Sequence, residues 1–192
     1  MIIVTIMWIG QIESRPDVNA PSFCLIKNIE YPDEFLYSSK ELDISDNYKR
    51  KVFTNPANEY FMKSFDQMGW IFLPVNGTND TFNLLNAKYY EHLCASDNHL
   101  EIFNYRRKVN TYRLNNDNLK KNKKCMWKLE LTSKGINRFI IRNVHFKQPL
   151  YAASDLLKTA KSKRRNVYTW YKNPDSRQFI WYIYCFEEKM YA

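Results

Sequence analysis

One short basic motif occurs three times along this chain of 192 residues. It reads KRKVFT from Lys49, RRKVNT from Arg106 and RRNVYT from Arg164. The copies begin 57 and then 58 residues apart. A motif that served only to contact a ligand would recur without its surroundings, whereas a repeat fold requires the whole unit to recur.

The surroundings of the motif recur as well. Three further landmarks share its period: FCLIKN, FNLLNA and FIIRNV; FLYSS, HLCAS and PLYAA; and WIFLP, WKLEL and WYIYC. They divide residues 23–187 into units 23–81, 82–138 and 139–187, with residues 1–22 before them and 188–192 after them. One structural unit is therefore built three times in a single domain.

Each landmark predicts a β-strand, because it is short, rich in β-branched and aromatic residues, and alternates in polarity. In the first landmark the alternation places Phe23 and Leu25 on the inner face, and hence Cys24 on the outer one. No segment shows a sustained helical period, so an all-β fold of twelve strands is expected. Four strands in each of three units resemble the β-trefoil superfamily, and the resemblance covers residues 23–187.

Two sets of residues in the repeat are expected to be structural. Trp70, Trp127 and Trp181 open the last strand of each unit and should occupy equivalent buried positions. The second cation of each motif is Arg50, Arg107 or Arg165. Because it recurs even in the acidic first unit, we expect it to bond loop carbonyls or aspartates of the preceding loop.

The N-terminal segment and two sequons favour secretion. MIIVTIMWIG is apolar but too short to span a bilayer, and it resembles the apolar part of a secretory leader that lacks its basic head. A tail packed on the barrel is the alternative. Asn76 and Asn79 lie in glycosylation sequons between the first and second units, as expected of an exposed loop in a secreted protein.

Four cysteines leave the disulfide question open. An even number suits an oxidising compartment. The trefoil brings Cys24 near Cys185, but the predicted alternation places them on opposite faces, which disfavours a bond. Cys94 replaces a tyrosine of the other units, and Cys125 is expected to be buried. The cysteines have no metal-ligand spacing, so no metal site is expected.

The sequence contains no catalytic constellation. It has no nucleophile elbow and no glycine-rich phosphate loop, its three histidines are isolated, and its adjacent carboxylates are ordinary surface charges. We therefore expect a non-enzymatic protein without a cofactor.

The charge is distributed unevenly among the units. Residues 1–81 have 7 basic and 11 acidic side chains, residues 82–138 have 12 and 5, and residues 139–192 have 10 and 4. A one-sided basic surface attracts polyanions, which for a secreted protein are sulfated glycans or anionic membranes rather than nucleic acid. The candidate contacts are Lys120, Lys121, Lys123, Lys124, Lys161, Lys163, Arg164 and Arg165. The alternative is that these loops are merely solvated.

Tyrosines suggest a second kind of contact. Tyr48 and Tyr105 precede the motif in the first two units and could stack on sugar rings, although packing within their hairpins is the expectation. Tyr37, Tyr151, Tyr182 and Tyr184 would favour a protein-interaction module if they formed one exposed patch. The sugar sites of ricin-type lectins cannot be carried over, because Gln67-Met-Gly-Trp70 is one residue longer than their Gln-x-Trp motif.

The sequence pattern LYA…RRNVYTW resembles that of small secreted trefoil proteins of insects. The prediction is thus a secreted, non-enzymatic β-trefoil that binds an anionic, heparin-like glycan through the basic loops of its second and third units. The alternatives are a protein-interaction module, such as an inhibitor, a cytokine-like ligand or a host-interaction factor, and a storage or structural protein without a specific ligand.

Overall fold

The computed structural model describes residues 12–13, 16–17, 21–46, 48–56, 61–99, 105–132, 137–157, 163–171 and 176–186. The expected leader (1–10), most of the lead-in to residue 22 and the C-terminal tail (188–192) lie outside these residues. The described part confirms the predicted β-trefoil.

Twelve strands form three units of four. They are β2 (Ser22–Asn28), β3 (Glu34–Asp43), β4 (Lys49–Pro56) and β5 (Gly69–Pro74); β6 (Thr81–Asn86), β7 (His92–His99), β8 (Arg107–Tyr112) and β9 (Met126–Leu131); and β10 (Arg138–Asn143), β11 (Leu150–Leu156), β12 (Arg165–Thr169) and β13 (Ile180–Phe186). A short strand, β1 (Ile12–Glu13), pairs with β13.

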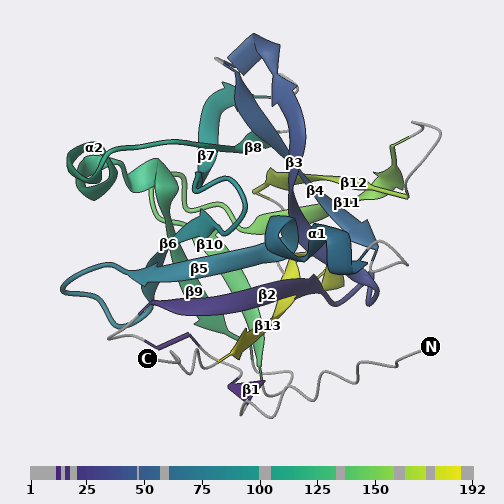
Figure 1. Cartoon of the computed structure of the whole chain (residues 1–192), viewed down its shortest axis with the longest axis horizontal. Coiled ribbons are helices and arrows are strands. Elements are labelled where there is room, and N and C mark those ends of the chain that lie inside the picture. The colour runs from purple at the N-terminus through teal and green to yellow at the C-terminus, as the bar shows by residue number, and fades with distance from the viewer. Residues whose placement is uncertain are drawn as a thin grey trace, which may run out of the picture.

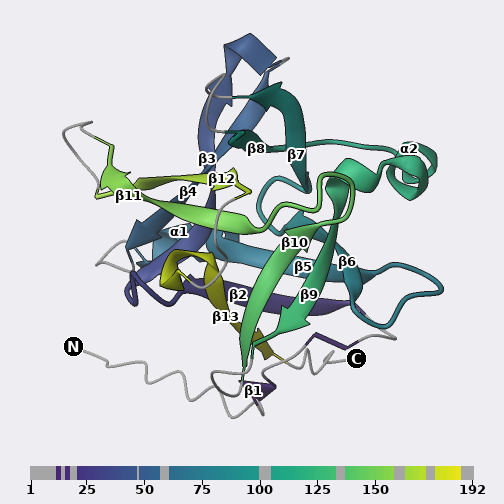
Figure 2. The same cartoon turned by 180° about the vertical axis from the view of Figure 1, so that it is seen from behind.

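Six strands close a barrel in the order β2, β5, β6, β9, β10 and β13, and β13 pairs back to β2. The hairpins β3–β4, β7–β8 and β11–β12 cover one end of the barrel, where β4, β8 and β12 pair with one another. Figures 1 and 2 show the barrel in the lower half of the molecule and the hairpins spreading above it. The three units are therefore related by an approximate three-fold axis through the barrel.

Two short helices lie between the third and fourth strands of a unit, and the expectation of no helix was wrong there. They are α1 (Phe61–Met68) and α2 (Asn116–Lys121). The side chain of Asn115 caps α2 by accepting a hydrogen bond from the Asn118 amide, at 2.9 Å. A capped helix of six residues is too short to show the apolar periodicity by which helices are recognised in a sequence. Three 3₁₀ turns, η1 (Ile44–Asp46), η2 (Lys123–Cys125) and η3 (Arg177–Phe179), complete the described elements.

The three tryptophans are fully buried in equivalent positions. Each indole nitrogen donates to the carbonyl of a leucine in the same unit: Trp70 to Leu36 at 3.0 Å, Trp127 to Leu93 at 2.8 Å, and Trp181 to Leu150 at 3.1 Å. This bond satisfies the one polar atom of the side chain, so the rest of the ring can be buried in the core without an unpaired donor.

A repeated asparagine, which the sequence reasoning missed, lies at the end of each first strand. Asn28, Asn86 and Asn143 are fully buried. Each side chain donates to carbonyls at the start of a neighbouring fourth strand and accepts from two amides of its own turn. The asparagines are 58 and 57 residues apart, and aligning the units on them would have revealed the signal.

The asparagines also correct the register of the first unit. Phe23 was aligned with Phe82 and Phe139, but with Asn28 in register it is Cys24 that occupies their position. Cys24 and Ile26 are therefore buried in the barrel, and the predicted outer facing of Cys24 was wrong. Cys24 lies directly opposite Cys185 in the β2–β13 register, and the two form a disulfide.

A second disulfide joins Cys94 to Cys125, so all four cysteines are paired. In the third unit Tyr151 and Phe179 occupy these positions and pack with Trp170. The disulfide thus replaces two large aromatic side chains with two small residues, and the core of this corner is held by a covalent bond rather than by ring packing.

The second cation of each repeated motif joins its unit to the next. The guanidinium lies over an aromatic ring of the following unit: Arg50 over Tyr89 at 3.9 Å, Arg107 over Phe146 at 3.9 Å, and Arg165 over Tyr31 at 3.6 Å. Each also donates to a backbone carbonyl of its own hairpin, at Lys40, Asp97 or Ser154. These contacts form a ring around the three-fold axis, which explains why the chain contains the motif three times.

Candidate functional site

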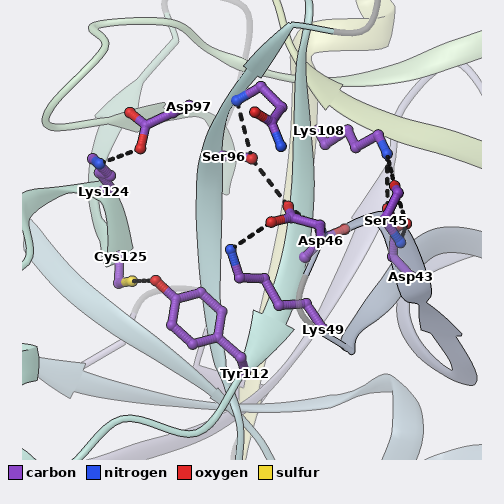
Figure 3. Close-up of polar contacts among 12 residues, drawn as sticks. Asp43, Ser45, Asp46, Lys49, Ser96, Asp97, Lys108, Tyr112, Lys124 and Cys125 are labelled. Atoms are coloured by element: carbon purple, nitrogen blue, oxygen red, sulfur yellow. Dashed lines mark hydrogen bonds and ion pairs between the residues drawn. The ribbon is translucent and has the colours of Figure 1, made fainter.

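A polar cleft of about 320 Å³ lies where the β3–β4 hairpin of the first unit meets the second unit. Its walls come from η1, the end of β7, Tyr112 on β8 and the loop after α2 (Figure 3). The lining residues are Asp46, Lys49, Ala95, Ser96, Asp97, Asn98, Tyr112, Asn122 and Lys124. This set combines carboxylates, amides, a hydroxyl, two cations and one aromatic ring.

The carboxylate of Asp46 is fixed in this cleft. Asp46 is only 6% exposed. It accepts hydrogen bonds from Lys49 Nζ at 2.8 Å, Ser96 Oγ at 3.0 Å and Asn110 Nδ2 at 3.0 Å. Three donors hold a buried carboxylate in one orientation. It therefore acts as a fixed anchor for the surrounding groups.

Tyr112 forms the aromatic wall of the cleft. The ammonium of Lys49 lies 4.8 Å from its ring centroid. Its hydroxyl is 3.3 Å from the Asn122 amide nitrogen, which donates to it, and 3.7 Å from the sulfur of Cys125. The ring is thus oriented from three sides, and the Cys94–Cys125 disulfide lies directly behind it.

An ion pair between Lys124 and Asp97 borders the cleft. The hydrogen bond from Lys124 holds the pKa of the Asp97 carboxyl below its usual range, and the charges of His145 and Arg107 lower it further. Burial lowers the pKa of Arg107, which nevertheless stays cationic at neutral pH. Two cations of the second unit, Lys124 and Arg107, therefore lie near one exposed carboxylate.

The predicted basic loop of the second unit adjoins this cleft. Lys124 lines it, whereas Lys120, Lys121 and Lys123 are exposed and have no carboxylate partner among the described residues. Asn122 fixes the loop, because its side chain accepts from the Lys124 amide and caps η2. The three exposed lysines are therefore free to meet an anion beside the cleft.

The basic residues of the third unit lie elsewhere. Figures 1 and 2 both place α2 and the strands β11 and β12 at opposite sides of the molecule. Arg164 pairs with Glu41 at 2.8 Å and Arg165 pairs with Glu34 at 2.9 Å, whereas Lys163 is exposed. Lys161 lies outside the described residues. The structure thus does not join the two predicted loops into one surface.

The predicted tyrosines separate into exposed and packed residues. Tyr48 is 69% and Tyr105 63% exposed, both with left-handed backbone angles at the start of a third strand, so the expectation that they pack within their hairpins was wrong. Tyr151 is buried, and burial raises the pKa of Tyr37 and of Tyr184. The four tyrosines proposed for a protein contact therefore do not form one exposed patch.

Two other features of the sequence can be placed. Asn76 and Asn79 are exposed in the loop between β5 and β6, so glycosylation there stays a prediction. Among the residues that the structure describes, no group of three or more His, Cys, Asp or Glu side chains could hold a metal ion. No helix within the same residues is long and apolar enough to cross a membrane.

The sequence matches no protein-family model and no curated protein. Solved structures, however, share its fold. The yeast (S. cerevisiae) protein O-mannosyltransferase Pmt1–Pmt2 complex bound to the sugar donor aligns with a TM-score of 0.71 at 12% identity, over 91% of this chain. The alignment covers only 26% of that protein, so this chain corresponds to about a quarter of it.

Two further solved structures with this fold are covered over more of their own length. A salivary protein from Culex, of the Cysteine and Tryptophan-Rich family, aligns with a TM-score of 0.60 at 19% identity over 90% of this chain and 97% of its own. A Polyporus squamosus lectin bound to a sialylated glycan epitope aligns with a TM-score of 0.59 at 14% identity, over 84% of this chain and 48% of the lectin. At these identities the likeness establishes the fold alone.

Proposed function

We propose that this protein is a secreted, non-enzymatic binding module for an anionic, heparin-like glycan. A sugar ring enters the polar cleft against Tyr112, and Lys120, Lys121 and Lys123 meet the acidic groups of neighbouring sugars. The observation that carries the proposal is the position, beside a cleft of fixed polar groups, of three lysines that have no carboxylate partner in the described part of the chain.

The chemistry of the cleft suits a carbohydrate. Sugars present hydroxyls to carboxylates and amides, and apolar ring faces to aromatic side chains. Asp97, Asn98 and Asn122 supply the polar groups, and Tyr112 supplies the aromatic one. The two disulfides support passage through an oxidising compartment, and the lectin with the same fold supports a trefoil as a scaffold for glycans.

Retention on immobilised heparin tests the role of the lysines. The variant with Lys120, Lys121 and Lys123 all changed to Gln should elute at lower salt, because fewer cations displace counterions from the polyanion, by analogy with nucleic acids. The matched control changes Lys40, Lys88 and Lys128 to Gln, which removes the same charge from other exposed sites. Equal elution of both variants would leave net charge as the only cause and contradict the proposal.

A glycan array tests the cleft separately. Tyr112→Asn gives the second unit the residue that the first unit has at the equivalent position, Asn55, and should abolish selectivity among sulfated glycans. Trp170→Asn at the equivalent position of the third unit is the control and should leave selectivity unchanged. The reverse pattern would place the sugar site in the third unit.

A second candidate, a protein-interaction module, is favoured by one observation. Leu42, Ile44 and Tyr48 at the end of the β3–β4 hairpin are 41%, 77% and 69% exposed. This hairpin projects from the top of the molecule in Figures 1 and 2. Exposed apolar side chains on a projecting hairpin are typical of a contact surface for a protein. Heparin retention that does not depend on the α2 lysines would favour this alternative.

A further inference from the structure

A second cavity, of about 330 Å³, lies on the three-fold axis at the hairpin end of the molecule. Strands β4, β8 and β12 surround the axis, and the valine of each repeated motif (Val52, Val109 or Val167) is buried toward the barrel. Because side chains alternate along a strand, the residues on either side of each valine point the other way, away from the barrel. They line this cavity, which is called the axial bowl below.

The walls of the axial bowl combine apolar and charged side chains. Leu157 and Tyr168 form the apolar part with the edges of the three valines, whereas Phe53 is 4% exposed and lies beneath the Arg164 guanidinium, 4.7 Å from its ring centroid. A volume of about 330 Å³ is at the lower end of the range for small-molecule sites. The bowl therefore suits a compact molecule with an aromatic ring or a short alkyl chain.

The charges around the bowl do not cancel. Five charged residues line it: Glu41, Asp43, Lys51, Lys108 and Arg164. Arg164 pairs with Glu41 at 2.8 Å, and Lys108 pairs with Asp43 at 2.9 Å. Burial raises the pKa of Asp43, but hydrogen bonds from Ser45 and Lys108 outweigh it, so the pKa of Asp43 is lowered and this pair stays charged.

Lys51 is the cation that remains. Within the described part of the chain, its side chain forms no ion pair and no hydrogen bond, although it lines the bowl and is half-buried. Its equivalents are Lys108, which is paired with Asp43, and Asn166, which is neutral. The departure from three-fold symmetry thus leaves a net charge of one positive unit on this cavity.

We propose that the axial bowl binds a small organic acid. The carboxylate of the ligand pairs with the Lys51 ammonium, and its apolar body packs against Leu157 and Tyr168. The ordered pairs Arg164–Glu41 and Lys108–Asp43 form the rim and leave a single charge for the ligand to neutralise. This site is separate from the polar cleft and does not depend on the glycan proposal.

Amide NMR of the full chain, titrated with benzoate, tests the proposal. Benzoate should shift resonances of the residues that line the bowl, and its affinity should fall about tenfold in Lys51→Gln, the loss of about 1.4 kcal/mol. Because the Lys51 side chain has no ion pair or hydrogen bond to lose within the described residues, this variant should fold normally. Benzamide, which has the same shape without the charge, should bind the wild-type protein as weakly as benzoate binds the variant.

Two outcomes would overturn the proposal. One is the absence of localised shifts at millimolar benzoate. The other is equal benzoate binding by the wild-type protein and Lys51→Gln, because Lys51 would then have no role. Heparin retention of Lys51→Gln should be unchanged, apart from the effect of one surface charge that Lys40→Gln also measures. If the experiments contradict the proposed acid site in the axial bowl, the glycan proposal therefore still stands, and the reverse also holds.

Discussion

The three junctions between units use the same arginine but different partners. Arg50 donates to Glu91 at 3.1 Å and Arg165 donates to Glu34 at 2.9 Å, so both junctions contain a partly buried ion pair. At the third junction the equivalent residue is Gln148, and the buried Nε of Arg107 has no hydrogen-bond partner among the described residues. The stacking on an aromatic ring and the bond to a hairpin carbonyl persist at all three.

The partner residues are tied to the motif a second time. The last residue of each motif is a buried threonine, whose hydroxyl donates to the same side chain: Thr54 to Glu34, Thr111 to Glu91, and Thr169 to Gln148. Gln148 accepts this hydrogen bond with its side-chain oxygen, and its side-chain nitrogen donates to the Tyr105 carbonyl. The comparison shows that stacking and carbonyl bonding define the junction, and that the ion pair is an addition.

The largest expected effect comes from removing a carboxylate. Glu34→Ala leaves Arg165 as a partly buried charge without its partner and should lower the free energy of unfolding by about 3–5 kcal/mol. Gln148→Ala at the equivalent position removes only neutral hydrogen bonds and should cost about 1–3 kcal/mol. Urea denaturation of both variants measures the difference. Equal losses would mean that the ion pairs contribute nothing beyond their hydrogen bonds.

Removing the arginine should cost more stability at a junction that contains an ion pair than at the third junction. Arg50→Met keeps an unbranched side chain over Tyr89 but leaves the carboxylate of Glu91 without its cation, at a cost of about 3 kcal/mol. Arg107→Met leaves no carboxylate without its ion-pair partner. It should cost about 1 kcal/mol, because one hydrogen bond to a carbonyl and the ring stacking are lost. The measurement is the midpoint of thermal unfolding, read beside heparin retention. A greater loss for Arg107→Met would refute the account of the third junction.

A smaller effect is expected from adding the missing carboxylate. Gln148→Glu supplies an acceptor for the orphaned Nε of Arg107 and should raise the free energy of unfolding by about 1 kcal/mol. The gain is limited because the bond from Gln148 to the Tyr105 carbonyl is lost. Glu91→Gln is the matched inverse and should be destabilising. A destabilising Gln148→Glu would show that repulsion from that carbonyl outweighs the new ion pair.

The sequence predicted the junctions only in part. The period of 57–58 residues identified the fold, and the recurrence of the second cation in the acidic first unit indicated a structural role. Its partners were not visible, because Glu34, Glu91 and Gln148 lie at or just before the start of the second strand of the following unit, and one of the three is not an acid. Contacts between units follow the topology and not the order of residues along the chain.

The polar cleft was predicted less well, for a related reason. Lys124 was among the candidates, but Asp46 and Tyr112 were not. Asp46 comes from the first unit and is held by Ser96 and Asn110 of the second, so no periodic signal marks it. The register error of one residue in β2 likewise hid the Cys24–Cys185 bond, because one step along a strand exchanges its two faces.

The smallest expected effect is on the pH dependence of stability. It concerns the residue that directly follows Glu34, Glu91 or Gln148 in the sequence. Phe35, His92 and Pro149 occupy this position, so only the second unit has a titratable group there. Burial lowers the pKa of His92, and its Nδ1 has no hydrogen-bond partner in the part of the chain that the structure describes, so folding disfavours the protonated imidazole. The unfolded chain therefore binds a proton more readily, and stability falls as the pH drops below the ordinary histidine pKa of about 6.5.

Replacing this histidine should remove that part of the acid sensitivity. His92→Phe gives the second unit the residue of the first, and above about pH 6.5 its free energy of unfolding should differ little from that of the wild-type protein. At lower pH the variant should be the more stable of the two, because it has no imidazole to protonate on unfolding. Asp43 and Asp97, whose lowered pKa values also make the fold acid-sensitive, are present in both proteins and cancel in the comparison. If the free energies of unfolding of the two proteins differ by the same amount from neutral to acid pH, His92 is protonated as easily in the folded protein as in the unfolded chain. The second junction would then accommodate a charged imidazole, just as the third junction accommodates the Arg107 guanidinium without a carboxylate.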